Sequence, residues 1–215
     1  VEEGLQGYAE VEAELLSVEE LRSRCDGLAC AEGDKLMTSA KRLVLRGDFA
    51  QAAEALRGAR RAYRLSLETH FATGIMRLEM QLATAIRLGA EVAAESAALE
   101  ALTAKVRKGD FELVQGSLVT IAEAVEERTR AAAGGRLAEA EALIARCAPG
   151  PGTDRARAAL AEARGRLARR EYEGAHALAG ELMEGLITER REGLDRSLGE
   201  GRELLEMAKR LGADS

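Results

Sequence analysis

The sequence predicts an all-α protein, an elongated array of about three helical repeats of about 61 residues that alternates short and long helices in three-helix layers. Two observations lead to this fold class. Leu, Ala, Glu and Arg dominate the 215 residues and only two residues are proline, which is typical of long helices. The stretch Leu45-Arg-Gly-Asp-Phe49 also returns later in the chain, and self-similarity at a long period is the signature of a repeat array.

The returning stretch sets the period. It recurs as Arg107-Lys-Gly-Asp-Phe111 and, with changed chemistry, as Ala168-Arg-Arg-Glu-Tyr172, so that the final aromatic residues are 62 and 61 positions apart. A set of glycines keeps almost the same interval. These are Gly27, Gly89, Gly150 and Gly212. Each unit of such an array contacts only its neighbours, so the length of the chain does not limit its core.

Apolar residues stand three and four positions apart on both sides of this stretch, which predicts a helix before it and a helix after it. When the three copies are aligned, equivalent positions form columns of apolar residues. The columns before the stretch are Met37, Leu99 and Leu160, then Ala40, Leu102 and Ala163, then Val44, Val106 and Leu167. A left-handed Gly can end the first helix and the Asp can cap the second. We expect the aromatic residue to pack back onto the first helix. The third copy lacks the Gly and the Asp, so we expect the same hairpin with a weaker turn.

The intervals between turn signals give the lengths of the helices. We expect a helix over residues 2–26, short helices of about 17 residues, and a long helix from about Phe49 to Leu88, since no proline interrupts it. In the second long helix two adjacent glycines predict a kink or break within residues 131–135. Pro149-Gly-Pro-Gly152 excludes helix and precedes the last short helix.

A short helix covers only half of a long one, so the next short helix must cover the other half. This predicts three-helix layers at 1–65, 66–127 and 128–188, followed by an overhanging half of the last long helix at 189–215. The overhang carries an apolar stripe that nothing in the chain covers, which predicts an interface. Its residues are Leu194, Leu198, Gly201, Leu205, Ala208 and Leu211. Either the protein continues past Ser215 or two chains pair through this overhang.

This arrangement of shared long helices resembles spectrin-type rods, and the helix, Gly-Asp-Phe, helix hairpin resembles the turn of tetratricopeptide repeats. The resemblance covers most of the chain, but it concerns architecture alone. The chain has no tryptophan of the kind that spectrin repeats use, and its period is nearly twice the tetratricopeptide unit. It therefore implies a helical repeat fold and no binding residues.

Charge and composition exclude several classes of function. The net charge is −6, and 31 Lys and Arg are interspersed among 37 Asp and Glu, whereas a nucleic-acid binder carries a basic face. Arg57, Arg60, Arg61 and Arg64 share one side of a helix, and a solvated or salt-bridged face explains them. No apolar run is long enough to cross a membrane. An odd number of cysteines without metal spacing indicates reduced thiols in a cytoplasmic protein.

The residues that could carry chemistry do not form a motif. His70 and His176 fall at different levels of different repeats, and neither has a second ligand at helical spacing, so we expect no metal and no cofactor. Cys30 and Cys147 occupy columns of small core residues, while Cys25 is the thiol expected to be more exposed. With no His near it in sequence, a catalytic cysteine is not predicted, and neither is an enzyme.

The sequence therefore favours a non-enzymatic helical-repeat scaffold or spacer that mediates protein–protein interaction, with self-association as one form of it. The expected partner is a protein or a second copy of the chain, not a nucleic acid, a membrane or a small molecule. The alternative is a helical linker or regulatory module of a larger signalling or filament protein. Val1 in place of a methionine and the uncovered last helix both suggest that alternative.

Overall fold

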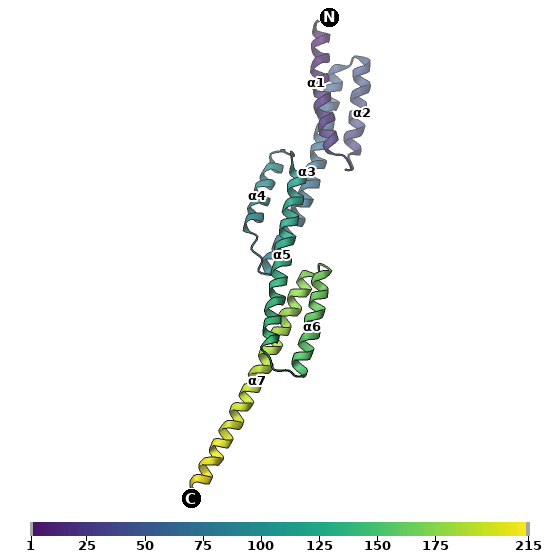
Figure 1. The fold of residues 1–215 in the computed structure, drawn as a ribbon. Helices are drawn as coiled ribbons and strands as arrows, with labels where there is room; N and C mark the ends of the chain where they lie inside the picture. The colour runs from purple at the N-terminus through teal and green to yellow at the C-terminus, as the bar shows by residue number, and fades with distance from the viewer. Residues whose placement is uncertain (1, 214–215) are drawn as a thin grey trace. The chain divides into compact units, whose positions relative to one another are not determined.

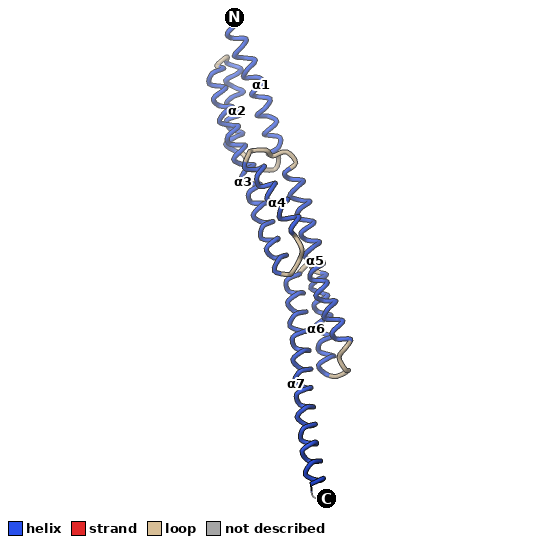
Figure 2. The backbone as a smooth tube through the Cα atoms, turned by 90° about the vertical axis from the view of Figure 1, so that its left-hand side faces the viewer, coloured by secondary structure: helices blue, strands red, loops and turns tan. Residues whose placement is uncertain are grey.

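The computed structural model describes residues 2–213, and the side chains of residues 7–210 and of Gly212. These residues form seven α-helices and no strand, so the all-α prediction is confirmed. Figure 2 shows the helices joined by short loops. The helices are α1 (Glu2–Arg24), α2 (Ala31–Arg46), α3 (Phe49–Arg87), α4 (Ala93–Arg107), α5 (Val114–Ala145), α6 (Pro151–Ala168) and α7 (Tyr172–Ala213).

The lengths of the helices follow the predicted alternation. The short helices α2, α4 and α6 have 16, 15 and 18 residues, and α3 and α7 have 39 and 42. Helix α5 is shorter, with 32 residues: it begins at Val114, three positions later than Phe111, where the columns place the start, and it ends at Ala145. The delay coincides with Leu113, whose backbone is left-handed with φ 57°, a conformation that a helix cannot contain.

Helix α5 also passes through residues 131–135 as uninterrupted helix, so the predicted break there is wrong. Two glycines in a helix cost about 2 kcal/mol relative to alanine. Thr129, Ala133 and Leu137, four residues apart, are all buried on one face of this segment. Packing of that face outweighs the low helix propensity of Gly134 and Gly135.

The chain divides into two compact units, Val1–Gln81 with Ala93–Glu123, and Leu82–Val92 with Ala124–Ser215. In the first unit α1 and α2 lie beside the first half of α3 (Figure 1). Tyr63 of α3 is fully buried between them, and Val18 of α1 is equally buried. Further along α3, Phe71 packs against Phe111, with ring centroids 5.7 Å apart.

The second unit has a core made by the second part of α5, by α6 and by the first part of α7 (Figure 1). Leucine and isoleucine side chains alternate there with alanines that have no exposed surface, and small side chains let helices approach closely. The fully buried alanines are Ala140, Ala163, Ala175 and Ala179. On α7 this core ends at Leu186.

The three equivalent turns share one hydrogen-bond pattern. Gly47 and Gly109 are left-handed, with φ 80° and 75°, and Arg170 takes the same conformation with φ 65°. In each turn this residue donates its N–H to the carbonyl three positions back, and the next residue donates to the carbonyl five back, which is the Schellman motif. The hairpin therefore forms in all three places, with or without glycine.

The aromatic residue after each turn contacts the helix that precedes the short one. Phe49 packs edge-on against Tyr8 of α1, and Phe111 packs against Phe71 of α3. The Tyr172 hydroxyl donates to Glu126 Oε1 of α5 at 2.9 Å. These contacts fix each new long helix against the helix before the hairpin, a contact that the repeat columns do not predict.

Candidate protein-interaction site

The predicted interface lies on the part of α7 beyond Leu186, where the core of the second unit ends. Every described side chain from Ile187 to Arg210 is exposed. Figure 1 shows this segment running on past α6. A helix that keeps apolar residues on a face without cover exposes a patch that ordinary monomers avoid.

The structure places the predicted interface residues in one exposed stripe. Leu194, Leu198 and Leu205 are 58%, 60% and 59% exposed. Gly201 and Ala208, between and after them, are also exposed. The side chain of Leu211 lies outside the described residues.

This stripe is rotated relative to the centre of the face that α7 buries in its own unit. The last buried positions are Leu182, Met183 and Leu186, and the exposed stripe begins at Leu194, eight residues after Leu186. Eight residues at 3.6 per turn rotate the face by about 80° around the helix axis. The stripe therefore lies about a quarter of a turn away from Leu186, on the side of the helix where Met183 closes the margin of the core.

Sequence reasoning missed three further exposed apolar side chains beside the stripe. Ile187, Leu204 and Met207 are 57%, 65% and 57% exposed. Ile187 stands seven residues before Leu194 and could have been found from that spacing. Leu204 lies on one flank of the stripe and Met207 lies further round the helix, so a period of seven does not include them.

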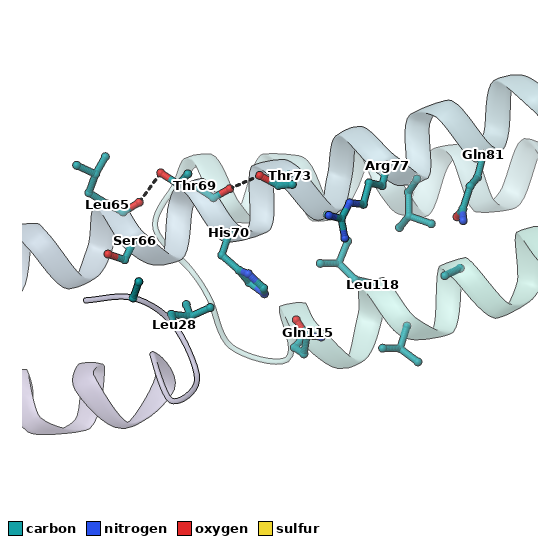
Figure 3. A pocket seen from close by; sticks show the side chains of 15 residues that line it. Leu28, Leu65, Ser66, Thr69, His70, Thr73, Arg77, Gln81, Gln115 and Leu118 are labelled. Carbon is teal, nitrogen blue, oxygen red and sulfur yellow. Dashed lines mark hydrogen bonds between the residues drawn. The ribbon is translucent and has the colours of Figure 1, made fainter. Parts of the chain in front are cut away.

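The first unit holds a groove of about 760 Å³ that sequence reasoning also missed. Its walls come from α3, from the start of α5 and from the loop between α1 and α2, as Figure 3 shows. His70 of α3 points into it near Gln115 of α5 (Figure 3). The hydroxyls of Thr69 and Thr73 donate to carbonyls of their own helix, so they are already satisfied. The groove offers one histidine and no paired acid and base.

A set of polar groups with shifted pKa values lies between α1, α2 and α3. Asp34 accepts hydrogen bonds from the Tyr63 hydroxyl at 2.9 Å and from Arg22 Nε at 2.8 Å. These bonds, that from Tyr63 first, lower the pKa of the Asp34 carboxyl. Burial, and then the hydrogen bond to Asp34, raises the pKa of Tyr63. Each group is thus held in its ordinary charge state at neutral pH, which suits a structural network.

Cys25 is buried, at 4% exposure, so the expectation that it is the more exposed thiol is wrong. Its Sγ donates to the Tyr63 carbonyl at 3.6 Å. Burial, with Cys30 beside it, raises the pKa of Cys25 to about 12. A thiol with that pKa is protonated at neutral pH, and the thiolate is the nucleophile, so Cys25 is poorly suited to catalysis.

The other candidate residues take structural positions. Cys30 is buried, and Cys147 is partly buried against the core of the second unit. His70 is exposed and His176 partly buried. Within the described part of the chain no group of three His, Cys, Asp or Glu residues could hold a metal. Of the cluster of arginines, Arg60 pairs with Glu14 at 2.9 Å.

Among the described helices, none combines the length and the apolar character that crossing a membrane requires. A comparison of the chain with protein-family models, with curated proteins and with solved structures finds no match. The fold alone thus defines the class, which is that of all-α proteins. The candidate site of this protein is the exposed stripe of α7.

Proposed function

We propose that this protein is a non-enzymatic helical-repeat scaffold or spacer that binds another protein through the second half of α7. One observation carries the proposal: Leu194, Leu198 and Leu205 are more than half exposed on the part of α7 beyond the core. Burial of apolar surface is the main driving force of protein association. At about 25 cal/mol per Å², covering three leucines favours binding by several kcal/mol before the costs of association.

The remaining polar sites support a structural protein. Asp34, Tyr63 and Arg22 satisfy one another, and Cys25 is held as a thiol. Active sites instead hold groups whose pKa values are moved toward the working pH. Three free thiols fit a reducing compartment, and we propose the cytoplasm.

The proposal is tested by chemical cross-linking of the whole protein in extracts of its source cells. The wild type is compared with the variant Leu198→Glu/Leu205→Glu, which places charge in the stripe. The control variant Arg196→Asp/Glu203→Arg changes two exposed side chains of the same segment and leaves the net charge unaltered. We expect one partner, either another protein or a second copy of the chain, to be cross-linked to residues 187–210 in the wild type and in the control. The stripe variant should lose this cross-link.

Equal recovery from all three forms, or no protein linked to this segment, would overturn the proposal. Circular dichroism provides the folding check. The substituted leucines are exposed, so all three forms should have the same helical content.

A further inference from the structure

Charged residues beside the stripe of α7 favour one way of covering it. We propose that the second half of α7 binds the same segment of a second copy of this chain, antiparallel, with the pair centred between Gly199 and Glu200. This inference rests on the proposed function and names its partner. The pair is isologous, so it closes as a dimer and does not extend into a filament.

The stripe has the spacing of a coiled-coil seam. Its positions alternate three and four residues apart, and each is exposed in the structure. The seam consists of Arg191, three residues before the stripe, and of the stripe residues Leu194, Leu198, Gly201, Leu205 and Ala208. A seam of this length over nearly three heptads matches a helix that packs along its side against another helix.

The proposed centre matches large side chains with small ones. It sets Leu198 of each copy against Gly201 of the other, and Arg191 against Ala208. Leu194 meets Leu205. A large residue opposite a small one fills the space between two close helices without a void, and it allows the backbones to approach. Gly201 weakens an isolated helix, but in the proposed pair it leaves room for the Leu198 side chain of the other copy.

Asp195 and Arg202 select this register. Both are exposed and stand at the same flank of the seam, each one residue after a seam position, Leu194 and Gly201. In the proposed pair Asp195 of one copy lies beside Arg202 of the other, and two-fold symmetry makes this contact twice. Flanking charges of this kind set the partner and the orientation of coiled coils.

The other registers bring like charges together. Moving the centre by half a heptad in one direction places Arg202 beside Arg202 of the second copy, and in the other direction it places Asp195 beside Asp195. A parallel pair would put Arg191 against Arg191 within the seam itself. Like charges directly opposed are destabilising, so the antiparallel pair centred between Gly199 and Glu200 is favoured.

The test is a charge swap measured by light scattering and sedimentation equilibrium on the purified full chain. Asp195→Arg and Arg202→Asp each replace two attractive contacts by two repulsive ones. We expect each to raise the dissociation constant of the dimer about tenfold or more. The double swap Asp195→Arg/Arg202→Asp restores the attraction with the signs reversed, so its dimer should form as the wild type does. An equimolar mixture of the two single variants should form heterodimers.

The control Arg196→Asp/Glu203→Arg reverses two charges on the opposite side of the helix and should leave the dissociation constant unchanged. A wild-type chain that stays monomeric up to its solubility limit overturns the inference. So does a dimer that the single swaps leave intact, or that the double swap does not restore. If another protein is still cross-linked to residues 187–210 in extracts, the proposed function stands while the second copy is excluded as the partner. If nothing is linked there, both fail.

Discussion

Arg170 takes the left-handed backbone conformation that Gly47 takes at the equivalent turn, with φ 65° against 80°. The Arg170 N–H donates to the Leu167 carbonyl as the Gly47 N–H donates to Val44. A residue with a Cβ pays about 1–2 kcal/mol for this conformation, and glycine does not. The third hairpin thus keeps the geometry of the first while it bears backbone strain.

We therefore expect Arg170→Gly to stabilise the protein by about 1 kcal/mol, because the relief of strain exceeds the added freedom of glycine in the unfolded chain. The variant also loses the ion pair between Arg170 and Glu126, at 3.0 Å. Arg170 is three-quarters exposed, and exposed pairs contribute little. Urea denaturation followed by circular dichroism measures the change.

The reciprocal variant Gly47→Arg should destabilise the first hairpin by a similar amount. Suppose that Gly47→Arg lowers the free energy of unfolding, but Arg170→Gly leaves it unchanged or lowers it too. The arginine would then have interactions in the third turn that outweigh the strain. That result would contradict a net cost of the left-handed conformation at Arg170.

The buried ring of Tyr63 occupies the space that a side chain at Gly33 would need. A Cβ built at Gly33 would lie 2.6 Å from Tyr63 Cε1, closer than real Cβ atoms come to their neighbours. Gly33→Ala gains helix propensity of about 1 kcal/mol but forces the ring to move, and overpacking costs about 1–3 kcal/mol. We expect a net loss of up to about 2 kcal/mol in the free energy of unfolding.

Gly185→Ala is the matched control, since Gly185 is an exposed helical glycine and a Cβ added to it would meet no atom within 4 Å. It should stabilise by up to about 1 kcal/mol. Opposite signs for the two substitutions in thermal and urea denaturation support the contact between Gly33 and Tyr63. A stabilised Gly33→Ala variant would mean that the ring is not held against α2.

Periodic columns and the Gly-Asp turn were enough to place most of the helices from the sequence. The predicted start of the first long helix at Phe49 is confirmed, and its predicted end lies one residue from Arg87. The start of α5 could not be predicted, because leucine favours helix and nothing in the sequence signals a left-handed Leu113. Helix α5 continues through Gly134 and Gly135 because one of its faces is buried against other helices. Helix propensity does not describe such packing, so it could not predict the continuous helix.

The candidate site was predictable to a similar degree. Leu194, Leu198 and Leu205 follow from helical spacing and from the lack of a covering segment, and the structure has them exposed. The burial of Cys25 depends on its contact with Tyr63, 38 residues away in the sequence, so local sequence patterns could not predict it. The groove at His70 needs three separate segments to come together, so a single periodic stripe does not reveal it.

Asp34 should make the protein more stable above pH 4 than below it. Its pKa is lowered in the folded state by the Tyr63 and Arg22 hydrogen bonds, so its contribution is present above the unfolded value of about 3.9 and is lost as the pH falls through the folded pKa. Asp34→Asn should lower the melting temperature at neutral pH, and the difference from the wild type should shrink in acid. Melting curves by circular dichroism between neutral and acidic pH measure it.

Glu12→Gln, a change at an exposed carboxylate of α1, is the control and should leave the melting temperature nearly unchanged. A difference between Asp34→Asn and the wild type that stays constant with pH would mean that the carboxylate acts by packing and not by charge. Since the Asp34 side chain is about half exposed, solvent screens part of the effect.

The thiols should react with iodoacetamide in an order set by burial and charge. Cys25 is 4% exposed and its pKa is raised to about 12, so at pH 7.5 its thiolate fraction is about a thousandfold below that of an ordinary cysteine. Cys147 is partly buried at the edge of the second unit and should be modified first. Mass spectrometry of peptides from the native protein, sampled over time, measures each rate. In urea all three rates should converge, because unfolding removes the burial of Cys25. If Cys25 reacts as fast as Cys147 in the native protein, then α1, α2 and α3 do not enclose it as the structure describes.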